Sequence, residues 1–458
     1  MSKVSLPTAP AFMVSAPGRV IVFGERDVVV LGEPRLAVVI SLRSYVLVTA
    51  QPKSRRNVTL SFRNIGLDHT WSIDTLPWST FHHPSKRKFY YSAVDSLDQE
   101  LLDAVMPHAQ AVSKNLPEEK RQNPIRFAAA FLYLFLSLGF PQTPGPVYSL
   151  RSDIPTNAGL RGSASMCIER VHQWAYVGAL CFHDRPTEID KTLRISSGGK
   201  AGMVRRTATG RDPSRDPSRA PSRAPSRAPS RAPSRNSSIL SPTYRCPKLR
   251  VLLVDTRQPR ATAEQLAKAK QLRQQQHEAT SLIFSAMGRV SESAWKLLLT
   301  AGGFRRPGQD ARDAFESLGA LVRMNHGLLD ALGLSHPGML RVRELVDRAG
   351  AGWCTLTRNG SRGGGGGYGF VLLRPDVSED VLGQLEWDFE AEGFQVYDVD
   401  LSAEGVGVVR NGLGGESGEE IDRETFEDAE DEEEIEERVS AGEGRDGGGW
   451  RFWMRADD

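Results

Sequence analysis

The chain has 458 residues, of which 40% are hydrophobic and 25% are charged, and its formal net charge is only +2. This length and hydrophobic content are enough for two ordinary domains with apolar cores and indicate a soluble globular protein. The four cysteines, Cys167, Cys181, Cys246 and Cys354, are too far apart in sequence for a zinc site or a redox pair, so we expect a reducing, cytoplasmic location.

The first foldable block covers residues 12–204, after an extension over residues 1–11 that lacks the apolar run of an exported protein. Its patterns predict strands at residues 12–15, 20–23, 28–31, 37–40 and 45–49 and helices at residues 101–111 and 126–138. The most apolar stretch, residues 127–138, has twelve residues, whereas a membrane helix needs about 20. We therefore expect a buried helix and no membrane partner.

Residues 205–246 separate this block from the next. Within them, residues 211–235 repeat Asp-Pro-Ser-Arg and then Ala-Pro-Ser-Arg, which supply no large apolar side chain and in which proline blocks regular hydrogen bonding. We predict a disordered surface insert. Phosphorylation of its serines or weak RNA binding stays open, but a plain loop is favoured and we expect no nucleic-acid partner.

The second foldable block covers residues 247–410. Its patterns predict a strand at residues 250–255, helices at residues 263–276, 280–299, 315–332 and 339–349, and strands at residues 369–373 and 395–399. The mixture in both blocks predicts an α+β protein of two lobes. We interpret His326 as a core residue, because its helix has no cysteine or second histidine at ligand spacing.

Residues 411–458 are rich in glycine and acid. Residues 416–437 hold fourteen acidic residues against one arginine, and such a run repels itself. We therefore predict a disordered tail. Docking of Trp450, Phe452 and Trp453 is the alternative that the sequence leaves open.

Charged side chains flank the strand predicted at residues 20–23. Residues 15–26 read Ser-Ala-Pro-Gly-Arg-Val-Ile-Val-Phe-Gly-Glu-Arg, with Arg19 before the strand and Glu25 and Arg26 after it. A Pro-Gly pair between strands is common, so this segment alone indicates only a turn.

A second motif covers residues 154–165, Ile-Pro-Thr-Asn-Ala-Gly-Leu-Arg-Gly-Ser-Ala-Ser. Glycines let backbone N–H groups approach a phosphate, and a helix N-terminus attracts an anion. Alone, this turn is also typical of ordinary helix capping.

Three more motifs follow. Residues 184–190 read Asp-Arg-Pro-Thr-Glu-Ile-Asp and lead to Gly198 and Gly199; residues 259–262 read Pro-Arg-Ala-Thr; residues 363–367 are all glycine. A bare glycine run would indicate a linker, but this one stands between two apolar segments.

In this order the motifs resemble those of mevalonate kinases, in the GHMP family of small-molecule kinases. The resemblance covers most of residues 12–199 and 250–410. It implies a two-lobed fold, whose N-terminal lobe has a mixed sheet and a phosphate-loop helix and whose C-terminal lobe is ferredoxin-like. It also implies ATP-dependent phosphorylation of the C5 hydroxyl of (R)-mevalonate in isoprenoid and sterol synthesis, with Mg²⁺ as cofactor, and it leaves a homodimer open.

The resemblance assigns roles to single residues. Asp190 falls on the catalytic aspartate that accepts the hydroxyl proton, and Arg19 replaces a lysine that stabilises the developing alkoxide. Glu25, Arg26 and Thr262 fall near mevalonate. The implied nucleotide contacts are Asn64, Ser152, Asn157, Ala158, Gly159, Leu160, Arg161, Gly162 and Ser163, and Ser163 also falls on the Mg²⁺-binding serine.

Several positions depart from the family pattern. Arg161 replaces a glycine where the phosphates pass, Arg26 replaces a histidine, and Ala179 replaces the glutamate that is the second Mg²⁺ ligand. Only nine positions separate Ser165 from Trp174, which indicates that a helix of the family is missing.

Three hypotheses therefore stay open. The first is an ATP-dependent mevalonate kinase. The second is a kinase-like pseudoenzyme, or an incorrectly assembled gene product, that at most binds nucleotide or a partner. The third is a GHMP kinase for a different alcohol, which Arg26 beside Glu25 favours, whereas Thr262 and the match through the second block favour mevalonate.

Overall fold

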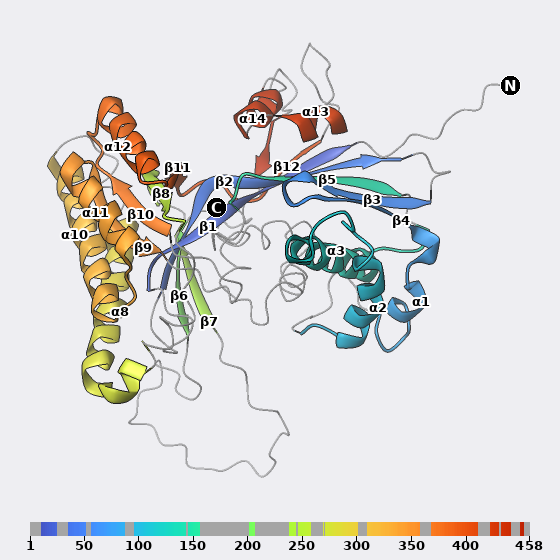
Figure 1. Ribbon diagram of the computed structural model, residues 1–458, viewed down its shortest axis with the longest axis horizontal. Helices are drawn as coiled ribbons and strands as arrows, with labels where there is room; N and C mark the ends of the chain where they lie inside the picture. The colour runs from blue at the N-terminus through green and yellow to red at the C-terminus, as the bar shows by residue number, and fades with distance from the viewer. Residues whose placement is uncertain are drawn as a thin grey trace, which may run out of the picture.

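The computed structural model describes most of both foldable blocks and parts of the C-terminal segment. The described residues are 11–24, 35–51, 56–87, 96–142, 145–155, 201–206, 238–243, 246–257, 269, 271–300, 309–357, 368–410, 422–429, 432–440 and 449–452. Helices and a large mixed sheet confirm the α+β class (Figure 1).

The first block contributes β1 (Phe12–Phe23), β2 (Arg35–Ala50), β3 (Asn57–Phe62), β4 (Leu67–Ser72) and β5 (Pro146–Ser152). β1 and β2 are antiparallel, and each combines two strands that the sequence predicts separately. In β1 the register shifts between Pro17 and Arg19, a bulge that lets the strand continue through the Pro-Gly pair. The strand expected at residues 28–31 lies outside the described residues.

Both faces of this part of the sheet are covered. β2 carries the run Tyr45-Val46-Leu47-Val48, in which all four side chains are buried. Successive strand residues point to opposite faces. Val46 and Val48 pack with α2 (Gln99–Ala109) and α3 (Glu118–Leu138), whereas Tyr45 and Leu47 pack with the C-terminal helices on the other side (Figure 1).

The apolar stretch at residues 127–138 is a buried helix, as predicted, and forms the second half of α3. The ring of Phe127 lies 5.1 Å from that of Phe62 in β3, centroid to centroid. Asp98 caps α2 by accepting hydrogen bonds from the N–H groups of Glu100 and Leu101. The short elements of this block are η1 (Arg63–Ile65), η2 (Ile73–Thr75) and α1 (Trp78–Phe81). No helix among the described residues is long and apolar enough to cross a membrane.

The second block adds strands in the order β11 (Gln395–Leu401), β8 (Leu249–Asp255), β10 (Tyr368–Leu373) and β9 (Gly352–Thr357). Its helices are α8 (His277–Leu299), α10 (Gln309–Ala331), α11 (Pro337–Ala349) and α12 (Glu379–Ala391), which lie together at one end of the molecule (Figure 1). The helices predicted at residues 280–299, 315–332 and 339–349 are confirmed. β9 and α12 were not predicted. Of the helix predicted at residues 263–276, residues 269 and 271–275 are helical, and half of the range lies outside the described residues.

A hairpin of β6 (Ala201–Arg206) and β7 (Ser238–Thr243) borders the predicted insert, and β6 also pairs with β2. Arg206 lies opposite Ser238 in the ladder. The predicted bounds 205–246 are therefore corrected, because strand pairing satisfies the backbone groups at both ends. Residues 207–237 lie outside the described residues.

The C-terminal segment differs from the predicted disordered tail. β12 (Gly407–Arg410) pairs with β1, α13 (Arg423–Asp428) and α14 (Glu432–Ser440) follow, and β13 (Arg451–Phe452) pairs with β12. β12 belongs to the predicted second block, whereas α13, α14 and β13 lie within residues 411–458, so the prediction of disorder is wrong for these last three elements. Phe426, Ile435 and Val439 are buried among apolar residues of β1 and β2. Their burial offsets the repulsion among the acidic residues.

Candidate active site

Arg19 lies in β1 directly after the bulge, opposite Val39 of β2, and its side chain is fully buried. Full burial is rare for arginine, because removing a guanidinium from water is costly unless polar groups surround it. Gly18 allows the two strands to approach closely. A Cβ at Gly18 would lie 3.0 Å from Cγ1 of Ile40 and 3.2 Å from the carbonyl oxygen of Leu42.

Two of the predicted nucleotide contacts lie together. Asn64 is in η1, Ser152 ends β5, and the Asn64 amide donates a hydrogen bond to the Ser152 carbonyl across 3.4 Å. The Ser152 hydroxyl also lies 2.8 Å from the hydroxyl of Ser44 in β2. Ser44 was not predicted. The signal that points to it is a polar interruption of the apolar strand at residues 41–44.

The predicted phosphate loop begins directly after β5. Ile154 is buried in the same cluster as Val20 and Ile40, and the N–H of Asp153 donates to the carbonyl of Arg43. The start of the loop is therefore packed against β1, which carries Arg19, and against its neighbour β2. Residues 157–163 lie outside the described residues.

β6 begins two residues after Gly199. Ala201 pairs with Val38 of β2, which in turn pairs with Val20 of β1. The strand that follows the Gly-Gly pair, β6, is therefore separated from β1, the strand of Arg19, by β2 alone.

The glycine-rich segment is anchored at both ends. The hydroxyl of Thr357, the last residue of β9, donates to the carbonyl of Ile21 in β1 across 3.0 Å. Tyr368, the first residue of β10, lies opposite Thr357, and its hydroxyl donates to Oδ2 of Asp255 across 3.4 Å. Thr357 was not predicted, since a threonine at a strand end carries no functional signal of its own.

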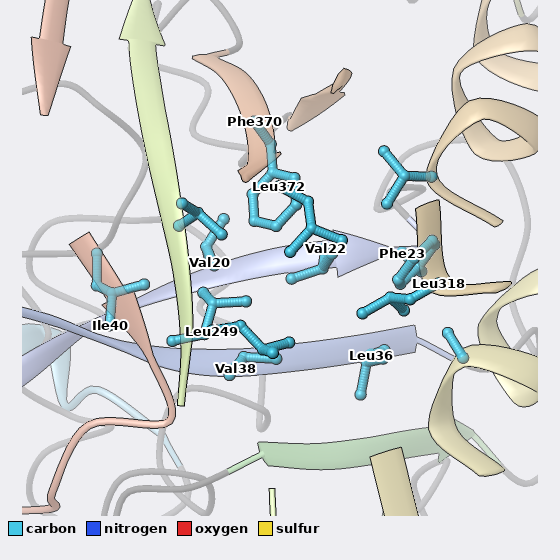
Figure 2. Packing of buried hydrophobic residues seen from close by; sticks show 14 of the residues in the cluster. Val20, Val22, Phe23, Leu36, Val38, Ile40, Leu249, Leu318, Phe370 and Leu372 are labelled. Atoms are coloured by element: carbon cyan, nitrogen blue, oxygen red, sulfur yellow. The ribbon is translucent and has the colours of Figure 1, made fainter. Parts of the chain in front are cut away.

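One apolar cluster joins these segments. Figure 2 shows Val20 and Val22 of β1 packing with Val38 and Ile40 of β2 and with Phe370 of β10. The cluster also contains Phe23, Leu36, Ile154, Met203, Leu249, Leu318, Tyr368 and Leu372. Because protein interiors are close-packed, the cluster holds the ends of four motifs in one arrangement.

The other predicted site residues lie outside the described residues: Glu25, Arg26, Asn157, Ala158, Gly159, Leu160, Arg161, Gly162, Ser163, Ala179, Asp190 and Thr262. The structure therefore leaves their roles as predictions. Within the described ranges, no group of three His, Cys, Asp or Glu side chains could hold a metal ion.

Two titratable core residues carry no sign of catalysis. His326 is 2% exposed, as expected of a core residue, and burial lowers its pKa. Burial raises the pKa of the Cys354 thiol to about 12, so it stays protonated and is a poor nucleophile.

The chain is similar over nearly its whole length to fungal mevalonate kinases. It is 44% identical to the mevalonate kinase of Aspergillus fumigatus, over 99% of this chain and 84% of that protein, and 40% identical to that of Gibberella zeae, over 98% and 89%. The crystal structure of L. major mevalonate kinase in complex with R-mevalonate has the same fold, with a TM-score of 0.54 over 88% of this chain and 100% of that chain at 17% identity. No protein-family model matches the chain. Identity at this level over the full set of motifs shows that the chain belongs to the mevalonate kinase family.

Proposed function

We propose that the protein transfers the γ-phosphoryl group of ATP to the C5 hydroxyl of (R)-mevalonate, giving ADP and 5-phosphomevalonate for isoprenoid and sterol synthesis. The observation that carries the proposal is the 44% identity to the Aspergillus fumigatus enzyme over 99% of the chain. The meeting of the motif ends around the strand of Arg19 supports it.

The chemistry requires alignment and charge neutralisation more than covalent catalysis. Asp190 would accept the proton of the C5 hydroxyl as its oxygen bonds to phosphorus and ADP leaves. Arg19 would stabilise the negative charge on the reacting oxygens. Glu25, Arg26 and Thr262 would hold mevalonate.

The nucleotide would bind between Asn64, Ser152 and residues 157–163, and Mg²⁺ would accompany its phosphates. Of the two side chains at the family's metal positions, Ser163 offers a hydroxyl oxygen, whereas Ala179 offers none. A hard cation takes oxygen ligands, so these residues fit a two-ligand magnesium site poorly. We assign no reaction step to a metal held by the protein.

A nucleotide-binding pseudoenzyme is the second candidate. Ala179 and Arg161 favour it, and so does the length of the alignment with the Aspergillus fumigatus enzyme. That alignment runs over 490 positions, more than the 458 residues of this chain, so the relative has residues without a counterpart here. This is in keeping with the missing segment predicted after Ser165. A different alcohol substrate remains the third candidate.

The proposal includes a division into two lobes. The first is the predicted block of residues 12–204, to which the rest of β6 and the paired strand β7 are added, and the second is residues 247–410. It also includes a cytoplasmic location, which the widely separated cysteines support. A homodimer is proposed from the family resemblance alone.

Single-turnover phosphoryl transfer at saturating Mg-ATP tests the function. We expect Asp190→Asn to lower the rate by roughly 10²-fold or more, the usual range for losing a general base. Ala179→Glu should raise turnover more than Arg19→Lys, because Arg19 still supplies a cation. Asp103→Asn, on the exposed side of α2, is the matched control.

Transfer that is insensitive to Asp190→Asn would contradict the assigned base. A folded parent chain that binds Mg-ATP but transfers nothing, with all variants equally inert, would favour the pseudoenzyme.

A further inference from the structure

The C-terminal helices α13 and α14 pack against the sheet through apolar side chains. Phe426 of α13 is fully buried with Met13, Tyr45 and Leu47, on the face opposite α2 and α3 (Figure 1). Glu436 of α14 accepts hydrogen bonds from the hydroxyl of Tyr45 at 2.8 Å and from the indole N–H of Trp450 at 2.6 Å. The segment is therefore docked by both apolar and polar contacts.

Glu427 is the centre of the polar contact between α13 and the sheet. Its Oε1 accepts hydrogen bonds from the Ser149 hydroxyl at 2.9 Å and from Nε of Arg423 at 2.7 Å. Its Oε2 lies 2.8 Å from a guanidinium nitrogen of Arg63, and its side chain is only 4% exposed. Burial opposes its ionisation, but the hydrogen bonds from Arg423 and Ser149 hold the pKa of Glu427 below its usual range. A buried carboxylate with this many partners has a specific geometry.

The partners of α13 are the immediate neighbours of two predicted nucleotide contacts. Arg63 precedes Asn64 in η1, and it binds Glu427 and Asp428. Arg151 precedes Ser152, and its guanidinium donates to the carbonyl of Ala429 at the end of α13. Both Asn64 and Ser152 therefore follow a residue that the C-terminal segment holds.

Strand geometry explains how the contact reaches the nucleotide side. Arg151 pairs with Tyr45 and Ser152 with Ser44, so these two residues of β5 point to opposite faces. Arg151 is held on the face of α13, while Ser152 points to the face of α3. A 3-10 helix as short as η1 has little stability of its own, so its position depends on such contacts.

We propose that α13, through Glu427, positions η1 and the end of β5 for binding ATP. This rests on the proposed function, since Asn64 and Ser152 are its nucleotide contacts. Glu427 is a positioning residue: it acts through Arg63 and Ser149. The acidic C-terminal segment is thereby part of the nucleotide site.

Glu427→Gln tests this, because it keeps the shape of the side chain and removes its charge. The matched control is Glu424→Gln, on the exposed side of the same helix. We expect the KM for ATP to rise about fivefold or more, the lower end of typical coupling between two sites. The kcat at saturating ATP and the KM for mevalonate should stay within about twofold of the parent, as for lost ground-state binding.

Amide hydrogen exchange provides a readout that does not need turnover. Glu427→Gln should speed exchange at residues 63–65 and 150–154 and leave α11 unchanged. If that variant is unstable, Arg63→Gln removes the partner, whose side chain is 55% exposed, and should give the same result.

Unchanged exchange at residues 63–65 and 150–154 in both variants would overturn the positioning role. Faster exchange with an unaltered KM for ATP would overturn its coupling to the nucleotide. A parent chain that neither binds ATP nor transfers phosphate would instead contradict the proposed function, and the exchange comparison would still decide whether α13 holds these segments.

Discussion

The hydroxyl of Thr357 donates a hydrogen bond to the backbone carbonyl of Ile21, although 336 positions separate them in the sequence. Thr357 ends β9, and Ile21 lies in β1 two residues beyond Arg19. The bond therefore determines where the glycine-rich segment leaves the sheet relative to the buried arginine.

Thr357→Val is expected to destabilise the protein by roughly 1–3 kcal/mol, because it keeps the shape but leaves the Ile21 carbonyl without this donor. Thr300→Val is the control, since Thr300 is exposed at the end of α8 and should change stability by only about 0.5 kcal/mol. Urea unfolding measures both. Equal midpoints for the two variants would contradict the prediction.

Phe426→Ala is expected to lower the free energy of unfolding by about 3–5 kcal/mol, the usual cost of deleting a buried phenyl ring. Leu282→Ala, at a side chain that is 72% exposed, should have little effect. Truncation after Arg410 should destabilise the protein as well, because it uncovers Met13, Tyr45 and Leu47. A truncated chain with the thermal midpoint of the parent would show that the C-terminal segment adds no stability.

Replacement of residues 207–237 by Asn-Gly is expected to keep stability within about 0.5 kcal/mol. Arg206 lies opposite Ser238, and a two-residue Asn-Gly turn fits such a hairpin. Removing Ser238 as well should lower the stability further, because it shifts the register of β7 by one residue and turns each of its side chains to the other face of the sheet. Thermal unfolding of the two deletion variants tests this difference in stability. Equal midpoints would argue against the observed register.

The pH dependence of stability should have a contribution from His326. Among the described residues, neither of its ring nitrogens has a hydrogen-bond partner, and burial lowers its pKa below 6.5. Between the folded pKa and 6.5, unfolding takes up a proton, so stability falls as the pH falls; above 6.5 the contribution vanishes. His326→Leu should therefore flatten the decline in urea midpoint as the pH falls below about 6.5. Parallel pH profiles for the two proteins would rule this out.

The local sequence pattern was enough to predict an element when one continuous apolar segment accounts for its burial. The apolar stretch at residues 127–138 predicted a buried helix, and the order of the motifs predicted the family. The family pattern also singled out Asn64 and Ser152, which the structure brings into contact, and Arg19, which is buried in β1; their roles in the site stay predictions.

The acidic segment shows where such reasoning ends. Its charge, summed along the chain, predicted disorder, yet Phe426 and Glu427 are buried by residues of β1, β2 and β5. The unbroken apolar run Tyr45-Val46-Leu47-Val48 was a signal that β2 needed cover on both faces, but it did not say which segment supplies it.

The sequence by itself therefore determined the family, the α+β class and the chemically specific residue types. Only the tertiary structure decided that Thr357 donates a hydrogen bond to Ile21. Only the tertiary structure likewise decided that the α13 segment binds Arg63 and Arg151, the residues that precede Asn64 and Ser152. The physical reason is that burial and hydrogen-bond partners come from segments hundreds of residues apart, whereas periodicity and charge report only on neighbours in the chain.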